Sequence, residues 1–346
     1  MIFSACPAPI LNHKTIVLGH GSGGKLSHQL IQKMILPAFR NPILETQHDG
    51  AVLQMPAGRI AFSADSYVVN PVFFPGGNIG DLAVNGTVND LAMCGARPQY
   101  LSASFIIEEG LPMDDFWRIL NSMRSAADAA GVSLVTGDTK VIDRGKGDKI
   151  FINTSGIGTI PEGRQIDPSL AAPGDAILLS GPIAAHGMAI MSVREGLEFD
   201  TLIESDTAAL NGLVETMLSV SDEVHVLRDP TRGGVASALN EIAERCRCGI
   251  LLEETSIPVP NDVQGACEVL GLDPLYVANE GRLLAFVASR DADKVLEAMR
   301  AHPRGRESVR IGEVIPEHPA TVLMKTRIGG TRIVDMLSGE QLPRIC

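Results

Sequence analysis

The sequence has few aromatic residues, little positive charge and no long apolar run. Aromatic residues make up 4% of the 346 residues, with a single tryptophan, so the cores must consist mainly of Leu, Ile, Val, Ala and Met. The net charge of −12 argues against nonspecific nucleic-acid binding, because Lys and Arg must replace the counterions on phosphate. No apolar segment approaches the roughly 20 residues of a membrane helix, and the first residues lack the basic region of a signal peptide. These absences predict a cytoplasmic protein without a membrane segment.

Cysteine is also scarce, with six residues at irregular positions. Such spacing is not typical of a disulfide framework. Cys246 and Cys248 form a C-x-C pair, but no second pair accompanies them, which argues against a structural zinc site.

Strand and helix patterns alternate along two stretches of the chain. Hydrophobic residues make up 45% and charged residues 20%, which is typical of a folded protein. Proline and glycine cluster over residues 161–175, as in a linker. The sequence therefore predicts two α/β domains, at 1–165 and 174–330, and a tail at 337–346 that lacks a clear period. In the first domain we expect strands at 15–18, 60–63, 99–107, 132–135 and 149–160, and helices at 26–36 (ended by Pro37), 79–94 and 112–130. In the second we expect helices at 183–195, 206–219, 232–246, 261–270 and 291–301.

A glycine-rich segment follows the first expected strand. Gly19, Gly24 and Lys25 fit the first part of the phosphate-binding pattern G-x-x-x-x-G-K. The next residue must be Ser or Thr to hold magnesium, and here it is Leu26. The pattern therefore argues against a standard P-loop, although backbone amides and Lys25 could still contact phosphate.

Four aspartates stand beside glycine or within apolar surroundings. Asp90 lies inside an expected helix, and the other three lie at expected strand ends or helix starts: Asp65, Asp138 and Asp229. Active-site loops of α/β proteins gather at such places, and carboxylates share Mg²⁺ with phosphate oxygens. Each aspartate could instead be a helix cap, a turn residue or a surface acid.

Asp81, Asn85 and Asn89 recur every four residues and share one face of the expected helix at 79–94. This stripe could face a ligand or solvent, and Asp81 could simply stabilise the first helical turn.

Charged residues around two further glycine motifs are also candidates for phosphate binding or for catalysis. Arg228 and Arg232 could bind phosphate together with the amide of Gly233 near a helix start, or could form salt bridges. Glu280 precedes a glycine and a strand, and could be a base or a turn acid.

The chain ends in cysteine, Cys346, which carries a free carboxylate. No cysteine stands four residues from the end, which excludes a prenylation box. A tail of about ten residues could extend roughly 33–36 Å. A thiol on such a tail could be loaded in one place and processed in another, or it could be incidental.

Together these segments resemble the HypE family of nickel–iron hydrogenase maturation factors, which are carbamoyl dehydratases. The similarity runs from about residue 16 to the last residue, and the C-terminal tetrapeptide is its most specific part. The segments that carry it are His20–Gly24, Asp65–Tyr67, Phe74–Asn78, Asn89–Asp90, Glu108–Pro112, Gly137–Lys140, Thr231–Gly234, Asn279–Gly281 and Pro343–Cys346.

The resemblance extends to aminoimidazole ribonucleotide synthetases, selenophosphate synthetases and thiamine monophosphate kinases. It implies an α/β fold of two domains, with the N-terminal domains of a homodimer forming a β-barrel, a C-terminal α/β sandwich and a flexible C-terminal tail. It also implies that ATP and Mg²⁺ are bound, the metal by Asp65, Asp90 and Asp229. The further nucleotide contacts would come from Asn89, Asp138, Arg232 and Gly233.

The implied reaction takes place on Cys346. A partner, HypF, places a carbamoyl group on this thiol, and ATP phosphorylates the carbamoyl oxygen so that it leaves as phosphate. The resulting cyanide passes to iron on a HypC–HypD complex. We expect Lys140 to lie near the carbamoyl oxygen and Glu280 to act as the base.

Two other functions are compatible with the same sequence features. A small-molecule kinase or a selenophosphate synthetase-like enzyme would phosphorylate a diffusible substrate and would need no terminal cysteine. A scaffold that presents its tail to other proteins would show no ATP hydrolysis.

Overall fold

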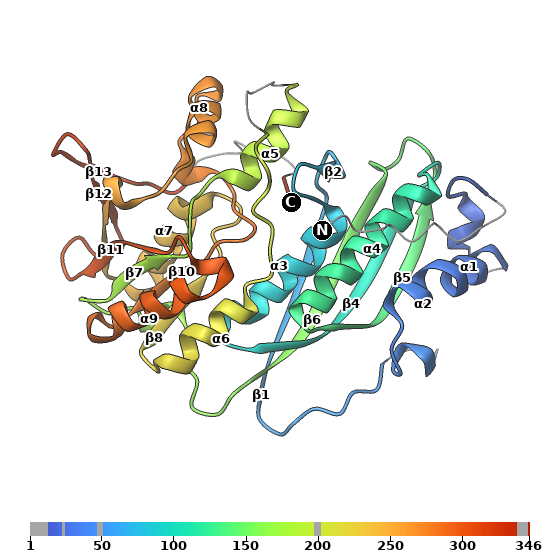
Figure 1. Ribbon diagram of the computed structural model, residues 1–346, viewed down its shortest axis with the longest axis horizontal. Helices are drawn as coiled ribbons and strands as arrows, with labels where there is room; N and C mark the ends of the chain where they lie inside the picture. The colour runs from blue at the N-terminus through green and yellow to red at the C-terminus, as the bar shows by residue number, and fades with distance from the viewer. Residues whose placement is uncertain (1–12, 23–24, 47–50, 197–201, 338–344) are drawn as a thin grey trace.

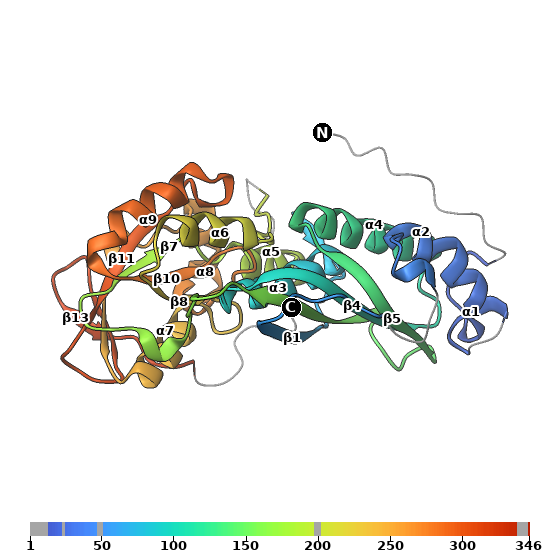
Figure 2. The same cartoon turned by 90° about the horizontal axis from the view of Figure 1, so that it is seen from below.

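The computed structural model describes residues 13–22, 25–46, 51–196, 202–337 and 345–346. Two α/β halves lie side by side, each built around its own sheet, and the C-terminus lies between them (Figure 1). The view in Figure 2 places the C-terminus in the same central position. The predicted glycines Gly23 and Gly24 and most of the predicted tail, residues 338–344, lie outside the described residues. Within them, no helix is both long enough and apolar enough to span a bilayer.

The N-terminal half is a four-stranded sheet with the order β1-β6-β4-β5. Neighbouring strands are antiparallel except β4 and β5, which are parallel. Two long helices, α3 and α4, pack on one face of the sheet and form the core with it. The strands are β1 (Arg59–Tyr67), β4 (Arg97–Glu108), β5 (Ser133–Ile142) and β6 (Ile150–Ile160); the helices are α3 (Ile79–Met93) and α4 (Met113–Ala130); a small hairpin, β2 (Phe73–Phe74) and β3 (Gly77–Asn78), precedes α3.

Strands β1 and β5 are longer than their apolar segments predict. Asp65 and Asp138 were expected after strands, but they lie within β1 and β5, paired with Thr154 and Ser104. Backbone hydrogen bonds continue each ladder through these polar residues, because strand pairing uses main-chain groups and does not require apolar side chains.

The first segment also differs from the prediction. Instead of a strand at 15–18, Thr15 makes an isolated bridge to Pro112, and a 3-10 turn follows at η1 (Leu18–Gly21). Pro37 does not end the helix, because a π-helical turn shifts the hydrogen-bond pattern before it, so that the Leu36 amide donates to Ile31. The elements here are α1 (Lys25–Leu30), η2 (Ile31–Ile35), α2 (Leu36–Phe39) and η3 (Leu44–Thr46).

The polar stripe of α3 faces neither solvent nor an open site. Asp81 completes a capping box, accepting a hydrogen bond from the Asn78 amide at 2.7 Å, and burial raises the pKa of Asp81 to about 6. Asn85 donates to Thr207 at 3.2 Å. Nearly all of α3 is buried, so its polar residues must bond to protein groups.

The C-terminal half is a seven-stranded sheet with helices on both faces. The strand order is β13-β12-β9-β11-β7-β10-β8, with only β12 and β9 parallel. Helices α5, α7 and α8 contribute to the core on one face, and α6 and α9 to the core on the other. The strands are β7 (Ala176–Leu179), β8 (Val224–Arg228), β9 (Gly249–Glu253), β10 (Leu284–Val287), β11 (Val309–Ile315), β12 (Val322–Lys325) and β13 (Thr331–Ile333). The helices are α5 (Ala185–Arg194), α6 (Asn211–Val220), α7 (Gly234–Cys246), α8 (Asn261–Leu270) and α9 (Ser289–Ala301), with short 3-10 turns η4 (Pro168–Leu170), η5 (Glu254–Ser256), η6 (Pro274–Tyr276) and η7 (Pro303–Gly305).

A second side chain of α3 also joins the two halves. Asn89 on α3 is 1% exposed; its amide nitrogen donates to the carbonyl of Ala208 at 3.0 Å, and its oxygen accepts from the Leu210 amide at 2.8 Å. Residues 206–210, expected to be helical, are therefore non-helical and α6 begins at Asn211. The polar atoms of Asn89 are used in this junction, which gives the residue a structural role.

Candidate active site

The last two residues of the chain are docked between the two halves. Ile345 is 3% exposed and packs in the N-terminal core, and the carbonyl of Cys346 accepts a hydrogen bond from the Val68 amide at 3.0 Å. The tail was predicted to be mobile and unpacked, and in the structure its last two residues are packed in a docked position. Burial of one apolar side chain and two backbone contacts bring the terminal thiol into the interior.

The Cys346 thiol lies near an acidic and a basic residue from the C-terminal half. Burial, together with the charge of the neighbouring Glu280, raises its pKa to about 12, and the charge of Arg232 opposes the rise. The docked thiol is therefore protonated at neutral pH and is a poor nucleophile.

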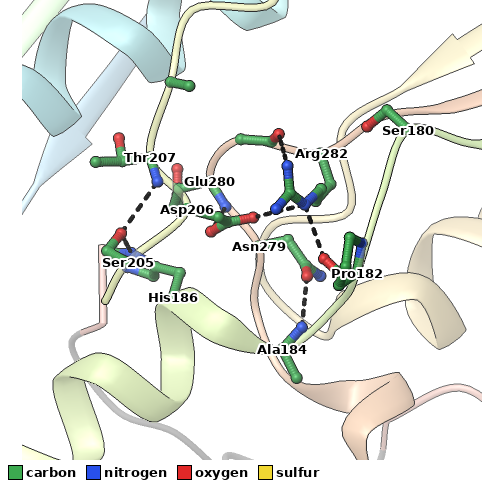
Figure 3. Close-up of polar contacts among 12 residues, drawn as sticks. Ser180, Pro182, Ala184, His186, Ser205, Asp206, Thr207, Asn279, Glu280 and Arg282 are labelled. Atoms are coloured by element: carbon green, nitrogen blue, oxygen red, sulfur yellow. Dashed lines mark hydrogen bonds and ion pairs between the residues drawn. The ribbon is translucent and has the colours of Figure 1, made fainter. Parts of the chain in front are cut away.

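Glu280 sits in a tight backbone arrangement beside this thiol. Its amide donates to Asp206 Oδ1 at 3.1 Å, and its carbonyl accepts from the Ala208 amide at 3.3 Å. Figure 3 shows Glu280 beside Asp206. A side chain at Gly281 would collide with the Asp206 carbonyl, so only glycine allows this approach. Burial raises the pKa of Glu280 well above its usual range, and the charge of Asp229 adds to the effect.

Three aspartates converge next to Glu280 from three different elements. Asp229 follows β8 and is buried, which raises its pKa to about 7, with a further contribution from Asp90. Asp90, in the last turn of α3, accepts from Ser63 Oγ at 2.7 Å, and burial raises its pKa as well. Asp65 on β1 contributes to the raised pKa of both. The structure thus brings three of the four candidate aspartates together, and their binding of a ligand stays a prediction.

The basic residues of the β8–α7 connection border this carboxylate group. Arg228 makes an ion pair with Glu241 at 2.5 Å, and its charge also lowers the pKa of Asp229. Gly233 has a φ of +75° and immediately precedes α7, and a side chain there would collide with Ser237. Arg232 is exposed and, as noted, its charge reaches Cys346.

The carboxylates do not form a closed metal cage. In the part of the chain that the structure describes, no group of three or more His, Cys, Asp or Glu side chains could hold a metal ion by itself. Mg²⁺, however, usually takes one or two carboxylates and completes its shell with phosphate oxygens and water. The buried aspartates raise each other's pKa because their negative charges repel, and a bound cation would neutralise this repulsion. The donor set therefore fits a magnesium nucleotide.

Asp138 and Lys140 do not join this group within one chain. They lie on β5, at the opposite edge of the four-stranded sheet from the β1 residue Asp65, about 14 Å away at three strand spacings. Lys140 Nζ makes an ion pair with Asp138 at 3.2 Å. Both residues line a pocket of about 260 Å³ under α1 and α2, together with His20 and Phe105. The positive side chain near Cys346 in the same chain is Arg232.

Sequence reasoning missed His186, which contacts the docked tail, and Ser205, which contacts the His186 ring. His186 Nε2 lies 2.6 Å from the carbonyl oxygen of Ile345, and its Nδ1 lies 2.7 Å from Ser205 Oγ (Figure 3). A single histidine in an apolar helix gives no motif, so only the fold reveals this contact.

Comparison with known proteins places this arrangement in a family. Residues 47–160 match the family model "AIR synthase related protein, N-terminal domain", and residues 172–325 match that of the C-terminal domain. The chain is 58% identical over 332 residues to carbamoyl dehydratase HypE of Cupriavidus necator, covering 96% of this chain and 95% of the relative.

Solved structures agree with the sequence comparison. A crystal structure of the hydrogenase maturation protein HypE in complex with ATP superposes with a TM-score of 0.93 at 50% identity, covering 96% of this chain and all of that one. A crystal structure of a HypE–HypF complex gives 0.79 at 48% identity, covering 89% of this chain and 99% of that one. Sequence identity over nearly the full length, with both domains matched and the terminal cysteine beside the carboxylates, shows that the chain belongs to the HypE family of carbamoyl dehydratases.

Proposed function

We propose that this protein binds ATP with Mg²⁺ and uses it to dehydrate a carbamoyl group carried on its own Cys346. The observation that carries the proposal is the position of the chain end: the Cys346 thiol lies beside Glu280 and within reach of the charges of Asp65 and Arg232. A substrate attached to this sulfur would lie between the buried Glu280 and the group of three aspartates. A related HypE crystallised with ATP supports the nucleotide.

Asp65, Asp90 and Asp229 would hold the magnesium nucleotide. When bound, Mg²⁺ would neutralise negative charge on the transferred phosphoryl group. Arg232 and the start of α7 at Gly233 would contact the phosphates.

The reaction converts a thiocarbamate into a thiocyanate. The γ-phosphoryl group of ATP moves to the carbamoyl oxygen, and the C–O bond then breaks, so that this oxygen departs in inorganic phosphate with ADP as the other product. Two protons leave the nitrogen as the C≡N bond forms; Glu280 is the group placed to accept one, and the other leaves with the phosphate. Arg232 stabilises the negative charge that develops on the oxygen.

Loading must take place with the tail undocked, because the docked thiol is protonated and half-buried. The partner that fits loading is HypF, since a relative is found in a HypE–HypF complex. We further propose that the finished cyanide is delivered to a HypC–HypD complex, which also needs an undocked tail.

The uncovered face of the N-terminal sheet supports a homodimer. Its outward side chains include Ile60, Phe62 and Ile106, which are large, apolar and exposed. In the described residues, β1 and β5 each have one edge without a strand partner. Two copies that pair β1 with β5 would close a barrel and cover these side chains.

Replacing Phe62 with Asp should therefore convert the dimer to monomers. Losing a buried Phe from each copy and burying a charge should weaken association at least about a hundredfold. The matched control is Ile333→Asp on β13, because Ile333 is 64% exposed and Phe62 is 68% exposed. Light scattering after gel filtration reports the mass of both variants, and a Phe62→Asp protein that stays dimeric would contradict this interface.

The proposed chemistry is tested by the mass of the C-terminal peptide after incubation with HypF, carbamoyl phosphate and Mg-ATP. We expect a carbamoyl adduct on Cys346 that loses one water only while ATP is hydrolysed. An unmodified Cys346 with ATP still consumed would instead indicate a kinase acting on a diffusible substrate, and absence of ATP hydrolysis would indicate a scaffold.

A further inference from the structure

A buried histidine that takes no part in the proposed chemistry contacts the docked chain end. His186 lies at the start of α5, is fully buried, and holds the carbonyl oxygen of Ile345 at 2.6 Å from Nε2. The next carbonyl, of Cys346, is held by the Val68 amide. Two consecutive carbonyls are thus fixed, one by each half of the molecule.

The hydrogen bonds around His186 define its tautomer. A carbonyl oxygen only accepts, so Nε2 carries the proton and donates to Ile345. Ser205 Oγ accepts from the Thr207 amide at 3.1 Å, which leaves the hydroxyl proton to be donated to Nδ1 of His186. Burial lowers the pKa of His186, in keeping with a neutral ring. Figure 3 shows Ser205 beside the imidazole.

The ring is also fixed against the segment that carries the proposed base. The Asn279 side chain accepts from the Ala184 amide at 2.7 Å, and the Gly187 amide donates to the Ala278 carbonyl at 3.1 Å, so the start of α5 is joined to the residues just before Glu280. His186 and Glu280 are therefore positioned by one connected piece of backbone. On its other side, the ring of Phe74 meets the imidazole edge to face at 5.6 Å.

We propose that His186 is a positioning residue that clasps the C-terminal tail, so that the sulfur of Cys346 stands beside Glu280 only while the His186–Ile345 hydrogen bond is made. Ser205 assists by orienting the ring. The inference rests on the proposed function only for the role of Cys346 as carrier, because the docking contacts are made between groups of the protein itself.

Undocking breaks this bond and leaves a buried donor of His186 to find another partner. A buried hydrogen bond of this kind shifts a docking equilibrium by about fivefold to tenfold. Its removal should therefore raise the undocked fraction of the tail by that factor, without a direct effect on the groups that bind ATP.

The undocked fraction can be measured from the rate at which iodoacetamide alkylates Cys346 in the absence of ATP and of any carbamoyl donor. The docked thiol is protonated and half-buried, so alkylation proceeds through undocked chains. We expect His186→Ala to react about fivefold to tenfold faster at Cys346 than the unmodified protein. The exposed Cys94 serves as the internal reference, and its rate should not change.

Two further variants separate a clasp from general loosening of the fold. His186→Gln keeps a side-chain N–H that can reach the Ile345 carbonyl and should restore most of the protection. His225→Ala removes another partly buried histidine, on β8, and should leave the Cys346 rate unchanged. The clasp is excluded if folded His186→Ala reacts at the normal rate, if the Ala and Gln variants react equally fast, or if Cys346 of the unmodified protein reacts as fast as Cys94.

The labelling experiment tests the clasp, and the dehydration experiment tests the proposed function, so each can be contradicted without the other. If the clasp exists and the proposed function is correct, His186→Ala loads its carbamoyl group at the normal rate or faster, but dehydrates it more slowly in a single turnover. A protein that shows the labelling pattern without dehydration retains the clasp and refutes the proposed function. Normal labelling of His186→Ala with normal dehydration in both proteins refutes the clasp alone.

Discussion

Replacing Glu280 with glutamine should slow the ATP-dependent loss of water from carbamoylated Cys346 by two to four orders of magnitude. This is the usual contribution of a positioned general base. Glutamine has nearly the shape of the protonated acid but cannot take a proton from the carbamoyl nitrogen. Loading by HypF and binding of ATP should persist, because neither step uses this carboxyl group. Single-turnover mass spectrometry of the preloaded protein measures the rate.

The same substitution should not destabilise the fold, and its effect should depend on pH. Burial and the charge of Asp229 raise the pKa of Glu280 in the folded protein above its unfolded value, so the folded state holds the proton more tightly. Stability from this proton is fully present below the unfolded pKa and is lost as pH rises towards the folded pKa. Without metal or nucleotide, Glu280→Gln should therefore be more stable than the unmodified protein at neutral pH, and this advantage should vanish below about pH 4. Urea unfolding across pH tests it.

Glu280→Asp provides the intermediate case. It keeps a carboxyl group but withdraws it by one methylene, so dehydration should be slowed less than by glutamine. A Glu280→Gln protein that dehydrates at the normal rate, with normal loading, would show that another group accepts the proton.

Regular apolar patterns made the buried elements predictable. Helices α3 and α4 lie within about one residue of their expected ranges, because their ends are marked by Asn78 and by Gly131 in the left-handed conformation. The structure also brings together Asp65, Asp90 and Asp229, and their role in holding a metal stays a prediction. Residue spacing alone does not indicate that these three carboxylates converge, and the family resemblance supplied that expectation.

What failed in the prediction depends on contacts distant in sequence. The stripe of α3 looked ligand-facing or solvated, but the Asn89 amide bonds to residues 208 and 210 of the other half. The tail gave no periodic signal, since the docking of Ile345 rests on one apolar side chain and on backbone carbonyls. Because His186 belongs to no motif, its partner is visible only in three dimensions.

Lys140 presents the sharpest disagreement between sequence and structure. The resemblance places it at the carbamoyl oxygen, whereas in one chain it lies on β5, across the sheet from Asp65. The two observations agree if β5 of the partner subunit pairs with β1, because this brings Lys140 of the partner subunit to the edge that carries Asp65. The proposed site then takes Cys346 and Glu280 from one chain and a lysine from the other.

A mixed dimer of Lys140→Ala and Glu280→Gln chains should therefore regain about half of the normal dehydration activity per dimer. Each homodimer is expected to be nearly inactive, since both of its sites lack one group. In the mixed dimer, the site with an intact Glu280 receives an intact Lys140 from its partner, and the other site carries both defects. Two different affinity tags allow the mixed dimer to be purified before the single-turnover measurement.

The matched control combines two defects on the same strand. Lys140→Ala and Asp138→Asn both alter β5, so in their mixed dimer each site receives one altered β5 and neither recovers, provided that Asp138 contacts the nucleotide as the family resemblance implies. Recovery in the first pair but not in the second can arise only if β5 acts on the neighbouring chain. If Lys140 served the Cys346 of its own chain, each site of the first mixed dimer would still carry one defect, and that dimer would stay as inactive as its parents. That outcome would require β5 and the docked tail to approach each other within one protomer, by a movement that breaks the strand order β1-β6-β4-β5.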